Sequence, residues 1–412
     1  MQDIELYGKI LGVRPPWKVE SVETDMKKLE ITIHVEYDSN VPVRCPICHE
    51  PSPVHDRNKR RWRHLDTCQM RTIIECDVPR TRCTEHGVKQ QTVSWAEKNS
   101  HFTALFEAMA ISWLKETNIK AVSKQLRVSW SQVALIQEKA VQRGLERRKE
   151  EPVKSLGIDE TSFQKRHEYV TVLMDNEKDQ VIDVLDNRRA EDLDAWLKQR
   201  PEAERAEFET ITMDMWDPYI KAVRENVPSS DEKICFDPFH VMSQFGKALD
   251  KVRAEEHREF LRKNGESCLK YTRFEWLRNS NKTDNRSRAG FLSLARSNMR
   301  TSRAWAIKET AARLWAYNSK EWAKKAWKSL CGWISRCRLE PVIKIGRTIR
   351  RYLWGILNAI VMKANNAKLE GKNARIQKIK SMACGFRNRE RFKNAILFHL
   401  GGLDMMPNLV NS

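Results

Sequence analysis

The sequence lacks the features of an exported or membrane-spanning chain. Its 412 residues contain no uninterrupted apolar run of about 18 residues, the length that spans a bilayer. The nearest candidate, residues 352–364, is too short and carries charged residues at its borders, Arg351 and Lys363. The first residues have neither the basic nor the apolar region of a signal peptide, and ten cysteines without such a signal indicate a reducing compartment. We therefore expect a cytoplasmic protein with no membrane partner.

The sequence also has fewer acidic residues than basic residues. The chain has 55 Asp and Glu against 74 Lys and Arg, which gives a net charge of +19. Such a surplus is typical of a protein that binds a polyanion, because Lys and Arg neutralise phosphates and release counterions. The alternative is a basic surface that only maintains solubility. A hydrophobic content of 41% and 14 tryptophans indicate a globular chain, and its length fits about two to four domains.

Four residues have the spacing of a tetrahedral zinc site. Cys45 and Cys48 form one half-site, and Cys83 and His86 form a second half-site further along the chain. A CxxC turn places two thiolates close enough to hold one ion, and three thiolates with one imidazole suit zinc. The ion would stabilise a small ribbon with little core of its own. His49 is a rival ligand, and the alternative to a metal site is a set of unconnected structural thiols.

Residues 101–149 have the pattern of three helices. The short second helix and the turn after it are typical of a helix-turn-helix, in which Ser129 can cap the third helix. That helix would lie in the major groove of DNA and present Trp130, Ser131 and Gln132 near its start. The alternative is an ordinary three-helix packing unit.

Residues 151–240 alternate between strand and helix patterns. Three successive strand patterns predict an antiparallel meander, and a helix, a strand, a helix and a strand follow. This is the order of an RNase H-like fold. The first and fourth strands are predicted to end on Asp159 and Asp214, and a late helix carries Glu370. Asp237, on the fifth strand, competes with Asp214, but the strand count favours Asp214.

An RNase H-like fold would bring Asp159, Asp214 and Glu370 together. Three close carboxylates repel one another unless a cation neutralises them. Carboxylate oxygens suit Mg²⁺ or Mn²⁺, and two such ions would activate a nucleophile and stabilise the leaving oxygen of a phosphoryl displacement.

Several motifs resemble, in order and spacing, those of bacterial insertion-sequence transposases of the ISL-three family, within the DDE group. The resemblance covers nearly the whole chain. The motifs are the zinc-ligand pattern, the helix-turn-helix, Arg-His-Leu-Asp at 63–66, Gly-Ile-Asp-Glu at 157–160, Met-Asp-Met at 213–215, Phe-Asp-Pro-Phe-His at 236–240, and the block 366–388 with Lys-Leu-Glu-Gly and Gly-Phe-Arg-Asn. His86 departs from the family pattern, which usually has cysteine there, although imidazole also binds zinc.

The resemblance implies a role for each group of residues. Asp159, Asp214 and Glu370 correspond to the catalytic DDE triad. Asp237 and His240 correspond to an auxiliary D-x-x-H motif. The basic residues of the last block are expected to contact DNA: Lys368, Lys372 and Arg375.

The expected fold is a multidomain α+β chain. It has an N-terminal β-rich zinc ribbon, a helix-turn-helix, and an RNase H-like α/β catalytic core interrupted by a large all-helical insertion. The charged run at residues 143–154 is predicted to be a linker. The predicted domains are residues 1–100, 101–150, 151–240, 241–345 and 346–412.

The implied function is that of a DNA transposase. It would bind the terminal inverted repeats of its insertion sequence and cleave and join DNA with Mg²⁺ or Mn²⁺, while zinc serves structure. Its partners would be double-stranded DNA and further copies of itself, in the bacterial cytoplasm and at the nucleoid when bound to DNA. The alternatives are a catalytically silent or domesticated transposase that regulates by binding DNA, and a structured-RNA nuclease; a zinc ribbon with a helix-turn-helix favours duplex DNA.

Overall fold

The computed structural model describes residues 3–149, 151–164, 168–278, 291–364 and 367–408, without the side chains of residues 367–370. The chain forms two compact units. The first contains the residues up to Lys149 together with those from Leu403 onward, and the second contains residues 150–402. Within the described ranges, no helix is both long and apolar enough to cross a bilayer.

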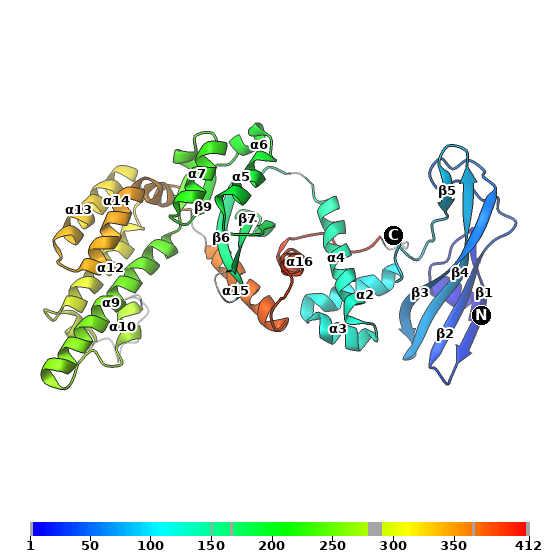
Figure 1. Cartoon of the computed structure of the whole chain (residues 1–412), viewed down its shortest axis with the longest axis horizontal. Coiled ribbons are helices and arrows are strands. Elements are labelled where there is room, and N and C mark those ends of the chain that lie inside the picture. The colour runs from blue at the N-terminus through cyan, green and yellow to red at the C-terminus, as the bar shows by residue number, and fades with distance from the viewer. Residues whose placement is uncertain (1–2, 150, 165–167, 279–290, 365–366, 409–412) are drawn as a thin grey trace. The chain divides into compact units, whose positions relative to one another are not determined.

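A five-stranded sheet dominates the first unit (Figure 1). Its order is β1-β2-β4-β3, and β5 pairs with the second half of β4. Strands β2 and β4 are parallel, while the other neighbours are antiparallel. The elements are α1 (Asp3–Ile10), β1 (Trp17–Asp25), β2 (Glu30–Tyr37), β3 (Val54–Thr67), β4 (Met70–Cys83) and β5 (Gly87–Gln90).

One face of this sheet has an apolar core. Buried and half-buried residues alternate along the whole of β2, as a strand with one covered face requires. Trp95 packs edge-to-face against both Trp17 and Trp62. Polar and apolar residues alternate at 17–22 and 29–35, a period of two that predicts two strands, and β1 and β2 confirm them. The sheet therefore has an apolar core of its own.

Three capped helices follow the sheet: α2 (Ala104–Glu116), α3 (Ile119–Leu126) and α4 (Trp130–Arg147). Ser129 forms a capping box with Gln132, in which each side chain bonds the other residue's backbone N–H. Thr103 and Asn118 cap the other two helices. The predicted cap at Ser129 is thus confirmed.

The Arg-His-Leu-Asp motif joins the sheet to these helices. Asp66, near the end of β3, forms ion pairs with Arg63 of the same strand and with Arg127 between α3 and α4. The buried His64 hydrogen-bonds through Nδ1 to Oγ1 of Thr103 at 2.9 Å. Burial lowers the pKa of His64 to about 4, so the ring is neutral at pH 7. The motif therefore holds the helices against the tip of the β3–β4 hairpin.

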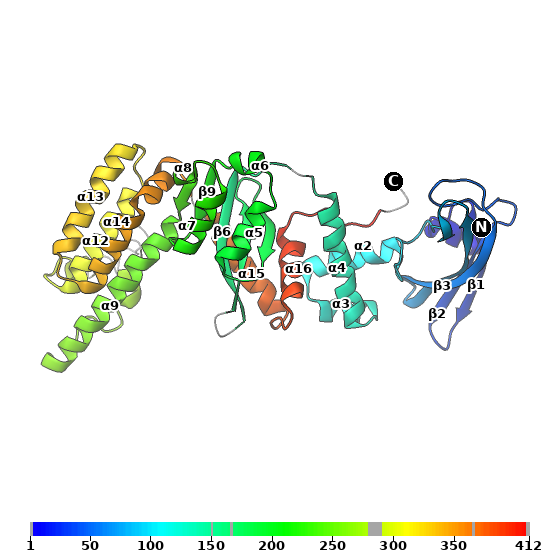
Figure 2. The same ribbon diagram turned by 45° about the horizontal axis from the view of Figure 1, so that its top comes forward.

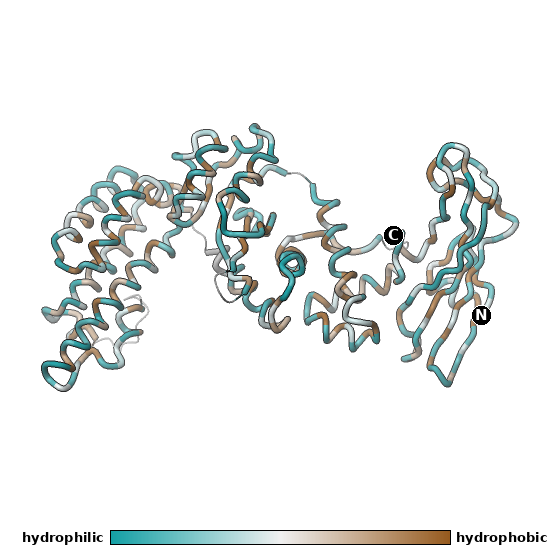
Figure 3. The backbone as a smooth tube through the Cα atoms, viewed as in Figure 1, coloured by the Kyte–Doolittle hydropathy of each residue, from teal (hydrophilic) through white to brown (hydrophobic). Residues whose placement is uncertain are grey.

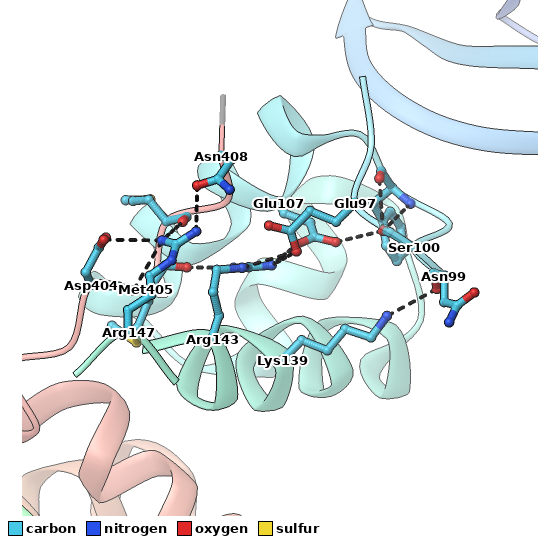
Figure 4. Close-up of polar contacts among 12 residues, drawn as sticks. Glu97, Asn99, Ser100, Glu107, Lys139, Arg143, Arg147, Asp404, Met405 and Asn408 are labelled. Carbon is cyan, nitrogen blue, oxygen red and sulfur yellow. Dashed lines mark hydrogen bonds and ion pairs between the residues drawn. The ribbon is translucent and has the colours of Figure 1, made fainter. Parts of the chain in front are cut away.

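The prediction that residues 143–154 are a linker is wrong at its start, because α4 continues to Arg147. Arg143 is buried and pairs with Glu97 at 2.6 Å and Glu107 at 2.8 Å (Figure 4). Its charge is compatible with burial because two carboxylates neutralise it.

Residues 403–408 pack along the same helix. Arg143 donates to the carbonyl oxygen of Met405 at 2.6 Å, and Arg147 donates to that of Met406 at 2.6 Å. A Cβ at Gly144 would lie 2.6 Å from Cβ of Leu403, so this close approach needs glycine. The segment after the second unit thus completes the first.

Replacing Arg143 with methionine is expected to destabilise α2–α4 by about 3–5 kcal/mol, because the carboxylate of Glu107 would stay buried without its guanidinium partner. Hydrogen exchange of the α4 amides in the full chain measures this loss. Arg147→Met is the control: it removes the ion pair with Asp404, whose side chain is 71% exposed, and the hydrogen bond to Met406, but leaves no charge buried without a partner, so we expect a smaller loss of about 1–2 kcal/mol. Equal effects of the two variants would contradict this account.

A second five-stranded sheet forms the centre of the second unit. Its order is β10-β9-β6-β7-β8. The pairs β10–β9 and β9–β6 are parallel, and β6–β7–β8 is the predicted antiparallel meander. The strands are β6 (Ser155–Gln164), β7 (Glu168–Asp175), β8 (Gln180–Leu185), β9 (Thr210–Met213) and β10 (Ile234–Phe236).

Helices surround this sheet and extend from it (Figures 1 and 2). Helix α15 packs on β6, α16 packs on β8, and α9, α12, α13 and α14 form a bundle joined to the sheet through β10. The helices are α5 (Ala190–Lys198), α6 (Glu202–Ala206), α7 (Asp217–Asn226), α8 (Ser230–Lys233), α9 (Pro238–Asn264), α10 (Arg273–Leu277), α12 (Arg300–Leu314), α13 (Lys320–Arg336), α14 (Glu340–Val361), α15 (Ala367–Met382) and α16 (Arg389–Leu400).

The helical region from α9 to α14 contains half of the 14 tryptophans. Apolar and polar residues alternate along its helices (Figure 3), and Trp276 and Trp327 are fully buried while Trp322 is 63% exposed. A Cβ at Gly355 of α14 would lie 2.5 Å from the ring of Phe236, so only glycine allows α14 to approach β10 this closely. The bundle thereby fixes β10 and the start of α9, which follows it directly.

Candidate functional site

The predicted zinc ligands lie together in the first unit. Cys45 and Cys48 belong to the loop between β2 and β3, Cys83 ends β4, and His86 lies in the turn before β5. The Sγ atoms of Cys48 and Cys83 are 3.7 Å apart, and Nδ1 of His86 lies 3.6 Å from Sγ of Cys83. A tetrahedron with Zn–S bonds of about 2.3 Å has S···S edges of about 3.8 Å, so the donor set fits zinc.

The chemistry of these donors agrees with their geometry. Hydrogen bonds from the backbone N–H and the side chain of His86, and from the backbone N–H of Glu85, lower the pKa of the Cys83 thiol to about 6. The thiolate, rather than the thiol, is the metal ligand. His49 does not belong to the cluster of four donors within 4.8 Å of one another, so the proposed ligands remain Cys45, Cys48, Cys83 and His86.

The predicted DNA-reading residues lie at the start of α4. Trp130, Ser131 and Gln132 are all exposed there. The amide oxygen of Gln132 accepts from the backbone N–H of Ser129 at 2.8 Å, so part of this side chain already serves the helix cap. Trp130, 41% exposed, presents a large aromatic ring at the surface.

Three aspartates lie in register at one edge of the three parallel strands of the second unit. The register pairs Gly157 of β6 with Thr212 of β9, and Thr212 with Cys235 of β10. Two residues further along the chain from each of these come Asp159 within β6, Asp214 just after β9 and Asp237 just after β10. The carboxyl ends of parallel strands meet at one edge of a sheet, which explains why these side chains converge.

All three aspartates differ in position from the prediction. Strand β9 ends at Met213, so Asp214 follows its last residue. The strand that carries Asp159 does not end there, because β6 continues to Gln164 in its pairing with β7. Only the pairing with β9 stops just before Asp159. The predicted fifth strand likewise ends at Phe236, because Pro238 begins α9 and Asp237 caps this helix through the backbone N–H of Phe239. Proline suits the first turn of a helix because it has no N–H to leave unpaired.

His240 lies among the three carboxylates. Its Nδ1 is 2.9 Å from Oδ1 of Asp214, and its Nε2 is 4.0 Å from Oδ1 of Asp159 and 3.7 Å from Oδ2 of Asp237. Burial alone would lower the pKa of His240, but the hydrogen bond and charge of Asp214 and the charges of Asp159 and Asp237 outweigh it and raise the pKa to about 9. Imidazolium therefore balances part of the acidic charge at pH 7.

Asp159 holds its proton more tightly than a solvent-exposed carboxyl does. Burial raises the pKa of Asp159 to about 6, and the charge of Asp214 adds to this shift, although a hydrogen bond from the backbone N–H of Glu160 opposes it. The ligand atoms of Asp159, Asp214 and His240 all lie within 4.8 Å of one another. Closely spaced hard oxygens of this kind fit Mg²⁺ or Mn²⁺.

Helix α15 runs beside Asp159. Asn373 donates from Nδ2 to Oδ2 of Asp159 at 2.6 Å. Glu370 lies three residues earlier on the same helix, which is one turn. The side chains of Glu370 and Lys368 lie outside the described residues, so the third member of the predicted triad remains a prediction.

Lys372 and Arg375, the other basic residues predicted to contact DNA, differ in how exposed they are. Lys372 is only 5% exposed, and its Nζ lies 2.8 Å from Oδ2 of Asp179. Its charge is therefore already paired within the unit. Arg375 is exposed on the same helix.

Glu160 and Asn373 are neighbours of the site for which the sequence predicted no specific contact. Glu160 pairs with Arg188 at 2.7 Å, and the Arg188 guanidinium lies 4.6 Å from the ring centre of Trp216. Burial raises the pKa of Glu160 to about 7, against the opposing charge of Arg188. The contact of Asn373 could have been inferred from the polar residues Asn373, Gln377 and Lys380, which recur on one face of a helix.

Comparison with known families agrees with this arrangement. The model of the ISL3 DDE family, described as a transposase, matches residues 156–396, more than half of the chain. The chain belongs to the ISL3 family of transposases. The helix-turn-helix domain of the ISL3 family matches residues 91–136, and the zinc finger of transposases IS204, IS1001, IS1096 and IS1165 matches residues 42–86. The resemblance inferred from the motifs is therefore confirmed.

The relatives of this ISL3 transposase extend over most of its length. The transposase for insertion sequence element IS1557 of Mycobacterium tuberculosis is 24% identical over 438 aligned residues, which cover 98% of this chain and 96% of the relative. The transposase for insertion sequence element IS1001 of Bordetella parapertussis is 24% identical over 344 residues, covering 82% and 84%. The zinc-finger match supports a structural zinc, and the DDE match suggests a divalent metal in the second unit.

Proposed function

We propose that this ISL3 transposase is an active DDE enzyme that cleaves the ends of its own insertion sequence and joins them to target DNA. The proposal assigns the second unit an RNase H-like core, into which the bundle of α9–α14 is inserted before α15. The level positions of Asp159 and Asp214 on neighbouring parallel strands are the observation that carries it. Glu370 on α15 would supply the third carboxylate.

Each residue of the site would have a distinct task. Asp159, Asp214 and Glu370 would hold divalent cations, which supply a nucleophile at neutral pH and stabilise the leaving oxygen when bound. His240 bonds Oδ1 of Asp214 and so orients this carboxylate. Asp237 fixes the first turn of α9 and adds negative charge that keeps His240 protonated.

The first unit would supply the DNA contacts. The exposed start of α4 would enter the major groove with Trp130, Ser131 and Gln132, while zinc bound by Cys45, Cys48, Cys83 and His86 would stabilise the neighbouring ribbon. Lys368, Lys372 and Arg375 would lie near the reacting strand, although Lys372 would first have to leave Asp179. Since two DNA ends must be joined, we propose that copies of the chain assemble on DNA, at the bacterial nucleoid in the cytoplasm.

The test is metal-dependent nicking of a labelled duplex that carries the inverted repeat flanking the gene. Full-length protein with Mn²⁺ is expected to nick the repeat end and to leave a scrambled duplex of equal length intact. Binding should fall at least about tenfold between 50 and 200 mM salt, because phosphate contacts release counterions. Binding without nicking under Mn²⁺ would support the alternative of a DNA-binding regulator, and nicking of structured RNA in preference to the repeat would contradict both.

A further inference from the structure

Three polar side chains connect α15 to β6, one on each successive turn. Asn373 donates to Asp159 at 2.6 Å, Gln377 donates to Oγ1 of Thr161 at 3.0 Å, and Lys380 donates to the carbonyl oxygen of Ser162 at 2.9 Å. Only the first of these three contacts reaches a carboxylate of the candidate site. Asn373 and Gln377 therefore both connect α15 to β6 through a side-chain amide but differ in what they touch.

The two oxygens of Asp159 have different surroundings. Oδ2 accepts the hydrogen bond from Asn373, while Oδ1 accepts from the backbone N–H of Glu160 at 2.7 Å and faces His240 and Asp214. Among the described residues, no other side chain donates a hydrogen bond to this carboxylate. Because Asp159 is only 8% exposed, little water is available to replace Asn373. The amide on Oδ2 and the N–H of Glu160 on Oδ1 therefore together fix the rotation of the carboxylate, and of these two only the amide belongs to a side chain.

The orientation of the Asn373 amide is fixed by chemistry. Only the nitrogen can donate to a carboxylate, and a reversed amide would place two acceptor oxygens against each other. With the nitrogen on Asp159, Oδ1 of Asn373 is buried and has no hydrogen-bond partner within the described part of the chain. A buried acceptor without a partner is unfavourable. The contact with Asp159 is thus retained although the other half of the amide is not satisfied.

We propose that Asn373 is a positioning residue that holds the carboxylate of Asp159 in the orientation that binds a divalent cation. The inference rests on the proposed function, because it assumes that Asp159 is a metal ligand. Partners that orient a metal ligand typically change metal affinity about 10–100-fold when they are removed. Asn373 itself need not touch the DNA or the ion.

The experiment measures Mn²⁺ binding to the zinc-loaded, full-length protein by electron paramagnetic resonance of free Mn²⁺, without DNA. Asn373→Ala is expected to raise the Kd for Mn²⁺ about 10–100-fold. Gln377→Ala, which removes a neighbouring contact of α15 on β6, is expected to leave it within about twofold. Hydrogen exchange of β6 and the affinity for repeat DNA should be alike in both variants. If the β6 amides of Asn373→Ala exchange faster than those of the wild type, Asn373→Ser replaces it. The same changes in Mn²⁺ affinity, hydrogen exchange and DNA affinity are then expected of Asn373→Ser.

The outcomes separate the inference from the proposed function. Unchanged Mn²⁺ affinity in Asn373→Ala, or an equal loss in Gln377→Ala, overturns the inference, because metal affinity would then report only the packing of α15. If Asp159→Asn binds Mn²⁺ as the wild type does, the proposed metal site is wrong and the inference falls with it. In the Asp159→Asn background, Asn373→Ala should have no further effect, since interacting residues are not additive.

Discussion

Removing zinc with a chelator is expected to unfold the loop at residues 44–53 and the turn before β5, while the sheet behind them, with Val41 and Val43 packed on its core, stays folded. The first half-site lies in a loop with turns and the isolated bridge between Arg44 and Pro51, and the second lies where the paired strands β4 and β5 turn, so metal bonds would be the main constraint on the loop. The core around Ile33, Trp62 and Ile74 lies elsewhere in the sheet and does not include the ligands. We therefore expect zinc removal to unfold only the end of the N-terminal ribbon that carries the four ligands.

The size of this effect should be large. Structural zinc contributes about 10–16 kcal/mol in zinc-finger peptides, so even part of it corresponds to exchange rates at least about 10³-fold faster for the backbone amides of Cys45 and His49. Hydrogen exchange with and without chelator measures this change. Cys83→Ser should behave like the chelated protein, and Cys68→Ser, which alters an exposed thiol outside the cluster, should behave like the wild type. Unchanged exchange after chelation would show that the site is not structural.

Replacing Asp159 or Asp214 with asparagine is expected to reduce Mn²⁺-dependent nicking at least about 10³-fold while repeat DNA is still bound. Asparagine keeps the size of the side chain but removes the negative charge that holds the ion, and metal stabilisation of the transition state is worth several kcal/mol. Glu370→Gln should have an effect of similar size. Single-turnover cleavage of a labelled repeat end measures the rates.

Two further variants make this test specific. Asp186→Asn removes a carboxylate whose partner is Lys393, outside the candidate site, and should leave cleavage unchanged. Asp237→Asn should lose activity about tenfold, because Asp237 acts on His240 and on the start of α9 rather than as the second member of the triad. If Asp237→Asn instead loses at least about 10³-fold and Asp214→Asn keeps wild-type rates, the two residues exchange roles.

Sequence patterns predicted the parts of this chain in which local rules decide the structure. Period-2 alternation located β2, and the capping residue Ser129 located the start of α4. The half-site spacings located four zinc donors that the fold brings within 4.8 Å. These features depend on neighbours a few residues apart, or on ligand spacing that a single ion imposes.

Other features depend on partners distant in sequence and could not be predicted locally. Arg143 resembled part of a charged linker because its partners Glu97 and Met405 are remote in the chain. The length of β6 beyond Asp159 depends on its pairing with β7 rather than on its own pattern. The level positions of the three aspartates required the strand register, which no single strand specifies.

The segment at residues 403–408 has a consequence for how the chain is made. It packs on α4, yet it follows the entire second unit in sequence. At about 5–20 residues per second, a ribosome would need roughly 10–50 s to synthesise the residues between them. During that time the side of α4 that receives Leu403 and Met405 stays uncovered. The unit expected to recognise DNA is therefore completed only after the unit expected to cut it has been synthesised, so a prematurely terminated copy would lack part of its DNA-binding half.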